Sequence, residues 1–220
     1  MPASWNLEFF RNVVVSMIAL ILSIAVHEFG HALVADRLGD RLPRSQGRVT
    51  LNPVAHIDLL GTIALPLMGL LFGVGAIGWG RPVMIQPLGF TRKLRMKTGH
   101  LLVAIAGPLM NILFGILISL IGLLLLRTGL VQNPLVLKAI FGVVYLNFVL
   151  AFFNLLPFPP LDGGAVLAGI LPDRSKVMEF LQSYGLYLAI AVMAIPYARL
   201  VYGLPAAFLY EFWLKLLGVR

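Results

Sequence analysis

The chain has 220 residues, of which 60% are hydrophobic and 12% are charged, and its mean hydropathy is +0.94. A soluble domain carries about twice that share of charged residues, so composition excludes an ordinary soluble protein. The formal net charge of +8 does not indicate nucleic-acid binding, because the basic residues lie in short loops beside apolar runs. The absence of cysteine excludes disulfides and thiolate metal ligands.

The first predicted element is a helix over residues 7–38, long enough to cross a bilayer and emerge from it. The start, MPASWNLEFF, lacks the basic region of a secretory signal. The apolar run leads into HEFGH rather than into a small-residue cleavage site. We therefore expect this helix to belong to the mature protein.

The next apolar segment, over residues 59–79, is broken by Pro66 and by several glycines. Arginines and lysines cluster on both of its flanks, over 36–58 and 80–100, and again at Arg174 and Lys176. Basic loops favour the cytoplasmic side, so both flanks are expected there. A re-entrant hairpin folded at the Pro and Gly residues satisfies this rule, and a simple span is the alternative.

The remaining elements are predicted to be helical. Long apolar helices are expected over residues 101–126 and 135–156, followed by a break at PFPPLDGG and a short helix, AVLAGIL. A last span is expected over 184–204, and the tail AAFLYEFWLKLLGV is expected at the membrane interface. The sequence thus predicts an all-α polytopic membrane protein, a single domain over 1–220, with about five transmembrane helices plus the hairpin.

The motif HEFGH combines His27, Glu28 and His31 at the end of the first apolar helix. Residues i and i+4 share one helix face, so the two imidazoles can bind one metal ion. Glu28 lies about 100° further round the axis, beside the metal, as a general base requires. A hydrogen-bonded polar cluster between helices is the alternative, but ionisable groups inside a membrane are expensive and usually functional.

A catalytic zinc ion needs a third protein ligand and an open position. Without cysteine the candidates include His56, His100, Asp58 and Asp162. Asp162 is favoured because it follows prolines that stop an apolar helix and precedes Gly163 and Gly164, which permit close backbone approach. An ordinary turn residue is the alternative reading of Asp162.

Two weaker candidates remain. His56 is predicted as a fourth ligand or as a donor to the reaction's oxyanion, and a loop histidine that caps backbone groups is an equal alternative. Asn111 is expected chiefly to join helices by hydrogen bonds, with the orientation of a ligand as the second possibility.

Five stretches together resemble the site-2 protease family of intramembrane zinc metalloproteases: HEFGH, AGPLMN at 106–111, NLLPFPPLDGG at 154–164, VTLNPVAHIDLLGT at 49–62 and GWGRPVMIQP at 78–87. The last two are similar to a small bacterial subgroup of that family. The matching stretches extend over most of the chain. Compared with longer relatives, the sequence begins with the HExxH helix and carries no PDZ or CBS domain, so the basis of substrate selection stays open.

The resemblance implies one zinc ion per chain, held by His27, His31 and Asp162, with Glu28 as the catalytic base. It also implies that Asn154 binds the substrate or the developing oxyanion. The expected substrate is a transmembrane protein or peptide in a lipid bilayer. The expected location is the bacterial inner membrane, with the active site toward the cytoplasm.

Two other classes of membrane protein share some of these features. A transporter or metal permease also holds intramembrane His and Asp, but paired broken helices in two repeated halves are expected there and no repeat is visible. A scaffold that binds transmembrane segments without cutting them is expected to have lost Glu28 or a ligand, and all are present.

Overall fold

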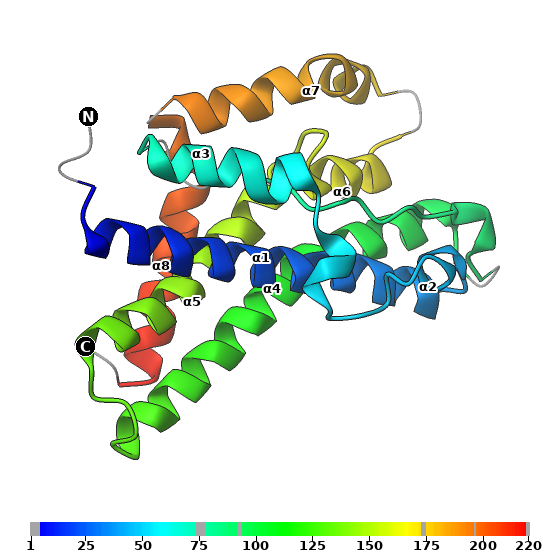
Figure 1. The fold of residues 1–220 in the computed structure, drawn as a ribbon. Coiled ribbons are helices and arrows are strands. Elements are labelled where there is room, and N and C mark those ends of the chain that lie inside the picture. The colour runs from blue at the N-terminus through cyan, green and yellow to red at the C-terminus, as the bar shows by residue number, and fades with distance from the viewer. Residues whose placement is uncertain (1–4, 74–77, 92–93, 173–174, 196, 219–220) are drawn as a thin grey trace.

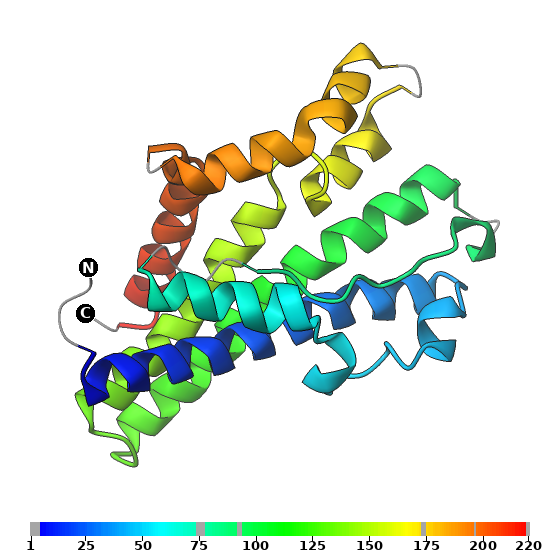
Figure 2. The same ribbon diagram turned by 45° about the horizontal axis from the view of Figure 1, so that its top comes forward.

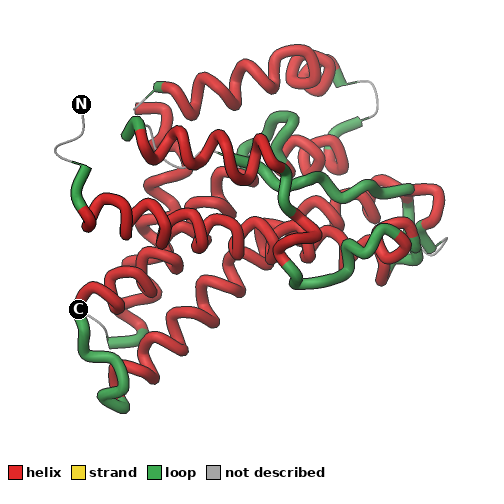
Figure 3. The backbone as a smooth tube through the Cα atoms, in the orientation of Figure 1, coloured by secondary structure: helices red, strands yellow, loops and turns green. Residues whose placement is uncertain are grey.

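The computed structural model describes residues 5–73, 78–91, 94–172, 175–195 and 197–218. The described part is helical and contains no strand, which confirms the predicted all-α class (Figure 3). Arg92, Lys93 and Arg174 of the basic stretches, and Pro196, lie outside the described residues.

Within the described ranges, four helices are long and apolar enough to cross a membrane. They are α1 (Leu7–Arg37), α4 (Met96–Arg127), α5 (Pro134–Asn154) and α7 (Lys176–Ala194). The shorter helices are α2 (Leu42–Ser45), α3 (Leu65–Leu71), α6 (Asp162–Ile170) and α8 (Leu200–Leu216). The predicted number of about five spans is not confirmed by this set.

Helix α4 lies at the centre of the bundle and packs against α1, α5 and α6 (Figures 1 and 2). Glycines make the α1–α4 approach close: a Cβ atom on Gly30 would lie 2.7 Å from the carbonyl oxygen of Ala106. Small residues are how membrane helices bring their backbones together. The close α1–α4 contact is what places the HEFGH face of α1 against a second helix.

The C-terminal part differs from the prediction of a span over 184–204. Helix α7 begins eight residues earlier, at Lys176, and ends at Ala194, two residues before Pro196 in the sequence. Helices end before proline because the ring disfavours helical backbone in the preceding residue. The predicted interfacial tail is α8, which packs on α5 through the fully buried Ala206, in one cluster with Val144 and Phe148.

The two described ends of the segment over 59–79 lie close together, and its helical part packs beside α1 (Figure 1). It begins as a π-helix over Leu59–Ala64, which continues into α3. The backbone N–H of Trp79 donates to the Gly61 carbonyl at 3.1 Å, and the Thr62 hydroxyl donates to the Trp79 carbonyl at 2.8 Å. Both ends of the segment therefore lie together, an arrangement that favours a hairpin over a span, and its position in the membrane stays a prediction.

Single cysteines in this naturally cysteine-free chain test the hairpin. Ser45, Met84 and Leu130 are exposed, and α4 separates Met84 from Leu130. Ser45→Cys and Met84→Cys should react with an impermeant maleimide from the cytoplasmic side of oriented vesicles, and Leu130→Cys from the opposite side only. Reaction of Ser45→Cys and Met84→Cys from opposite sides would make the 59–79 segment a true span.

Candidate metal centre

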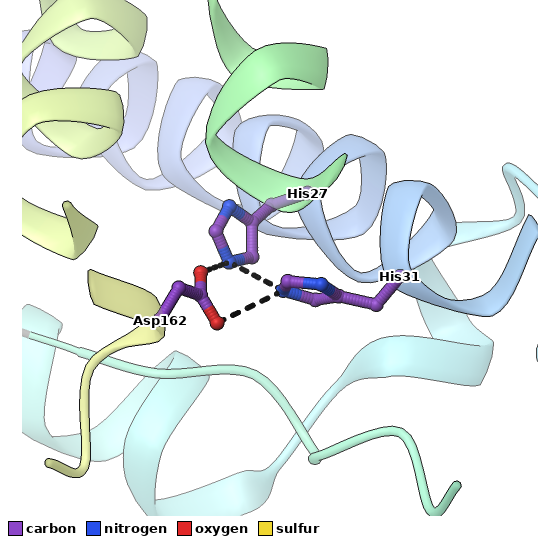
Figure 4. Close-up of side chains that lie close together, drawn as sticks. All are labelled: His27, His31 and Asp162. Atoms are coloured by element: carbon purple, nitrogen blue, oxygen red, sulfur yellow. Dashed lines mark hydrogen bonds and ion pairs between the residues drawn. The ribbon is translucent and has the colours of Figure 1, made fainter. Parts of the chain in front are cut away.

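Three side chains from two helices converge at the centre of the bundle (Figure 4). His27 and His31 project from one face of α1, and Asp162 is the first residue of α6. One ligand atom from each residue can be chosen so that all lie within 4.8 Å of one another. The Nε2 atoms of the two imidazoles are 3.1 Å apart, and Asp162 oxygens lie 3.1 Å from Nε2 of His27 and 3.4 Å from Nε2 of His31.

The turn before α6 explains how Asp162 reaches the histidines. A Cβ atom on Gly163 would collide with the carbonyl oxygens of Leu155 and Leu156, and one on Gly164 would lie 2.5 Å from the nitrogen of Pro159. Only glycine permits this approach of the chain to itself. The glycines that follow Asp162 thus let the chain fold back tightly, as the sequence predicts.

A third glycine leaves room for the imidazole nitrogens. Gly107 lies on α4, opposite the HEFGH face of α1. A Cβ atom built there would collide with Nε2 of His31 and lie 2.7 Å from Cε1 of His27. Any side chain at this position would therefore displace the two rings.

The proton on His27 is fixed by a chain of hydrogen bonds that begins on α5. The Asn147 amide nitrogen donates to the Val143 carbonyl at 2.8 Å, so the Asn147 oxygen must be an acceptor. The Asn111 amide nitrogen donates to that oxygen at 2.9 Å and to the Ser23 carbonyl at 3.2 Å. The Asn111 oxygen is therefore the acceptor for Nδ1 of His27 at 2.6 Å, and Nδ1 carries the hydrogen.

The same reasoning fixes His31. Its Nδ1 lies 2.7 Å from the backbone carbonyl oxygen of Val103, which can only accept, so this nitrogen is also the donor. When both rings are neutral, neither Nε2 atom carries a proton. The two unprotonated nitrogens then lie next to one another and next to the Asp162 carboxylate. Consistent with this, Oδ2 of Asp162 is buried and has no hydrogen-bond donor.

This donor set fits a metal ion. Three lone-pair donors placed this close repel unless a cation lies between them. Two imidazole nitrogens and one carboxylate oxygen are ligands that zinc uses, and three protein ligands leave a fourth position open, as in catalytic sites. Metal-binding histidines commonly donate the other ring N–H to a carbonyl or side-chain oxygen, as His27 and His31 do here.

Glu28 lies beside this group rather than in it. Its side chain is half-buried, and no hydrogen bond or ion pair involves its carboxylate among the described residues. The extended segment that follows 59–79 crosses here: a Cβ atom on Gly80 would lie 3.0 Å from Oε1 of Glu28. The carboxylate is thus free to accept a proton, next to a backbone that can approach closely because it carries no side chain.

The structure does not bring the other two predicted residues into the group. Asn154 ends α5, and its amide nitrogen donates to the Leu150 carbonyl at 3.0 Å. His56 is buried, and its Nε2 lies 2.9 Å from the Thr50 carbonyl oxygen, so Nε2 is the donor and Nδ1 has no partner. The only N–H group of a neutral His56 ring is therefore already donated to the Thr50 carbonyl oxygen.

Sequence reasoning missed Asn147 and Ser23, and it gave Asn111 mainly a structural role. Asn111 joins helices and also orients His27, so both readings of this residue apply. A lone asparagine within the apolar 134–154 helix was the available signal for Asn147, because polar side chains in such helices usually bond across to a neighbour. The Val103 carbonyl could not have been found, since backbone groups leave no mark on the sequence.

Comparison with known proteins agrees with this geometry. The sequence model of Peptidase family M50 matches residues 129–196, which include Asp162. The chain is 35% identical over 186 residues to YwhC of Bacillus subtilis, named as a candidate zinc metalloprotease, covering 82% of this chain and 80% of that relative. No solved structure gives a significant match.

Two further relatives are more distant. Rip2 of Mycolicibacterium smegmatis, also named as a candidate zinc metalloprotease, is 31% identical, covering 80% of this chain and 65% of that relative. Zinc metalloprotease MJ0392 of Methanocaldococcus jannaschii is 26% identical over 77% of this chain and 37% of its own length.

Apolar helices around a largely buried His–His–Asp group define an integral membrane metalloprotease. The chain belongs to peptidase family M50, the site-2 protease family, as the sequence motifs predict.

The hydrogen bond from His27 to Asn111 gives a test of how the ligands are oriented. Asn111→Leu removes the acceptor, so the imidazole loses its fixed tautomer, and affinity for Zn²⁺ should fall by about 10–100-fold in chelator competition. Ser119→Ala is the matched control, because Ser119 is a buried polar residue of α4 that bonds to Trp213 instead. Unchanged affinity in a folded Asn111→Leu protein would show that the network does not support the ligand.

Proposed function

We propose that this protein hydrolyses peptide bonds within or near the transmembrane segments of its substrates, with one zinc ion held by His27, His31 and Asp162. The main support is the convergence of three proton-free donor atoms in the interior of a membrane helix bundle. A zinc ion bound there would supply Lewis acidity, which activates a water molecule and polarises a carbonyl group. The remaining steps fall to the chain's own residues.

Glu28 is proposed as the general base and then the general acid. Its position one residue after His27 places it beside the ligands but off their face of the helix. With no partner among the described residues, the carboxylate can take a proton from the attacking water and deliver it to the leaving amine. A general base must be within hydrogen-bond reach of the proton that it removes, and Gly80 keeps that side of Glu28 free of a side chain.

Asn154 and His56 are proposed to assist at the substrate carbonyl. An amide group has two N–H donors, and the Leu150 carbonyl uses one of those on Asn154, so a second remains for a substrate oxygen. His56 as an oxyanion donor or fourth ligand stays a prediction. Donation through Nε2 requires its ring to leave Thr50, whereas ligation through Nδ1 leaves that bond in place.

The proposed location is the inner membrane, with the active site toward the cytoplasm. His31 lies six residues before Arg37, which corresponds to roughly 9 Å along a helix. Arg41, Arg44 and Arg48 follow directly, and such clusters favour the cytoplasmic side. The catalytic group would therefore lie within the bilayer, near its cytoplasmic face.

A helical substrate must unwind before it reacts, because helix formation hydrogen-bonds its carbonyls internally. The extended residues 79–82 pass beside Glu28, and the backbone N–H of Arg81 donates to the His56 carbonyl at 2.9 Å. We expect an unwound substrate to lie along this segment and to pair with its free backbone groups.

Replacement of Glu28 separates a protease from a transporter or a scaffold. Glu28→Gln keeps the shape of the side chain but cannot accept a proton at neutral pH. Zinc content and substrate binding should persist, while cleavage of a reporter with one membrane-embedded segment falls by about 10³-fold or more. Glu179→Gln, the same change at an exposed position of α7, should cleave like the wild type. Near-wild-type cleavage by Glu28→Gln would refute the proteolytic mechanism.

A further inference from the structure

A second polar site lies next to Glu28 and has no part in the metal centre. It is an open cleft of about 570 Å³ between residues 46–55 and residues 81–84, lined by Arg48, Arg81 and Met84 among others. Its volume falls within the ~300–1,000 Å³ range typical of ligand sites. The lining contains two arginines and no acidic residue.

Arg48 is unusual because it is a buried cation without an anion. Its side chain is only 4% exposed, and its guanidinium donates to the carbonyl oxygens of Ala55 and Pro82. Among the described residues, neither Arg48 nor Arg81 forms an ion pair. Burial lowers the pKa of Arg48, and the positive charge of Arg81 lowers it further, while the negative charge of Glu28 raises it.

A buried charge without an ion-pair partner is unfavourable, and a neighbouring charge of the same sign makes it more so. Carbonyl oxygens satisfy two of the five N–H donors of the Arg48 guanidinium but do not neutralise it. A carboxylate bound in the cleft would neutralise it, and arginine binds carboxylates through two parallel hydrogen bonds. The charge on both side chains therefore indicates an anionic occupant.

The position of the cleft indicates where that anion comes from. Arg81 directly follows Gly80, where a Cβ atom would lie 3.0 Å from the Glu28 side chain, and consecutive Cα atoms are ~3.8 Å apart. A chain whose scissile bond lies at Glu28 would thus place its next few residues beside Arg81 and Arg48. A polypeptide can occupy both places at once, whereas a lipid headgroup can fill the cleft only.

We propose that Arg48 and Arg81 form a specificity subsite for an acidic side chain of the substrate, a few residues from the scissile bond. This inference rests on the proposed function, since it assumes a substrate chain beside Glu28. It assigns the substrate a chemical feature, an Asp or Glu at the cytoplasmic end of its transmembrane segment. Arg81 is exposed and lies at the rim of the cleft, whereas Arg48 is buried and forms part of its wall.

Binding rather than cleavage tests the subsite, so that the outcome does not depend on the protease mechanism. Glu28→Gln protein in phosphatidylcholine nanodiscs is titrated with a fluorescent Leu/Ala transmembrane peptide that carries Glu-Glu at its cytoplasmic junction. Twin peptides carry Gln-Gln or Lys-Lys instead. We expect the acidic peptide to bind about tenfold tighter than the neutral twin, in the range of hydrogen bonds to charged groups.

Further substitutions in the Glu28→Gln background identify the residues responsible. Arg81→Gln should bring the ratio of the two affinities close to one, and Arg81→Glu should reverse it in favour of the Lys-Lys peptide. Arg48→Gln should act like Arg81→Gln, and the exposed Arg81 keeps the test decisive if the buried variant fails to fold. Arg41→Gln is the matched control, because Arg41 is an exposed arginine that lines a different cavity, and it should keep the tenfold ratio.

A ratio near one in the parent protein, or a tenfold ratio that survives both arginine substitutions, overturns the subsite. A ratio near one in the parent protein, together with binding of phosphatidylglycerol that Arg81→Gln weakens, overturns it in favour of a headgroup site. If the ratio behaves as expected but the wild type cleaves none of the peptides, the protease proposal fails and the anion site stands.

Discussion

The structure depends on one electrostatic constraint: two proton-free imidazole nitrogens and a carboxylate lie about 3 Å apart inside an apolar bundle. In a low dielectric such a group is unfavourable unless a cation joins it. The orienting bonds come from α4 and α5: the Val103 carbonyl holds His31, and the Asn147–Asn111 chain holds His27. Because these partners can only accept, both lone pairs face inward. The surrounding helices therefore define the donor set as much as the ligands do.

Glycines allow the backbone to fold around this group. Gly107 leaves space for the two rings, Gly163 and Gly164 bring Asp162 back toward them, and Gly80 lets an extended segment pass beside Glu28. Each is a place where a Cβ atom would enter a van der Waals contact that has no room for it. The Glu28 side of the centre is consequently lined by backbone, with Arg48 and Arg81 directly beyond it. Gly80 lies beside Glu28, and the next two residues, Arg81 and Pro82, line the basic cleft.

Much of this site could be predicted from the sequence, because its residue types have few other uses in a membrane helix. The i, i+4 spacing places His27 and His31 on one face, and the prolines and glycines around Asp162 mark a break that only tertiary contacts can stabilise. The limits of α1 and α5 also follow from apolar length, whereas α4 begins at Met96, five residues before the predicted start, because its first turn lies in the polar stretch MKTGH. The predicted bounds of the last span, 184–204, were wrong. Helix α7 begins in the amphipathic stretch KVMEFLQS, where the hydropathy of the sequence does not mark the start of a helix. The position of the His56 ring could not be predicted, because it depends on a hydrogen bond to the backbone carbonyl of Thr50.

X-ray absorption at the zinc edge of the purified wild-type protein tests the central claim most directly. The account predicts one zinc per chain with the imidazole nitrogens of His27 and His31 and light oxygen neighbours at about 2.0–2.2 Å, and one imidazole fewer in His31→Ala. A third imidazole around the metal in the wild type would select His56 as the fourth ligand over its alternative role as an oxyanion donor. An unchanged spectrum in His31→Ala, or protein that binds no zinc, would contradict the assignment of the group as a metal centre.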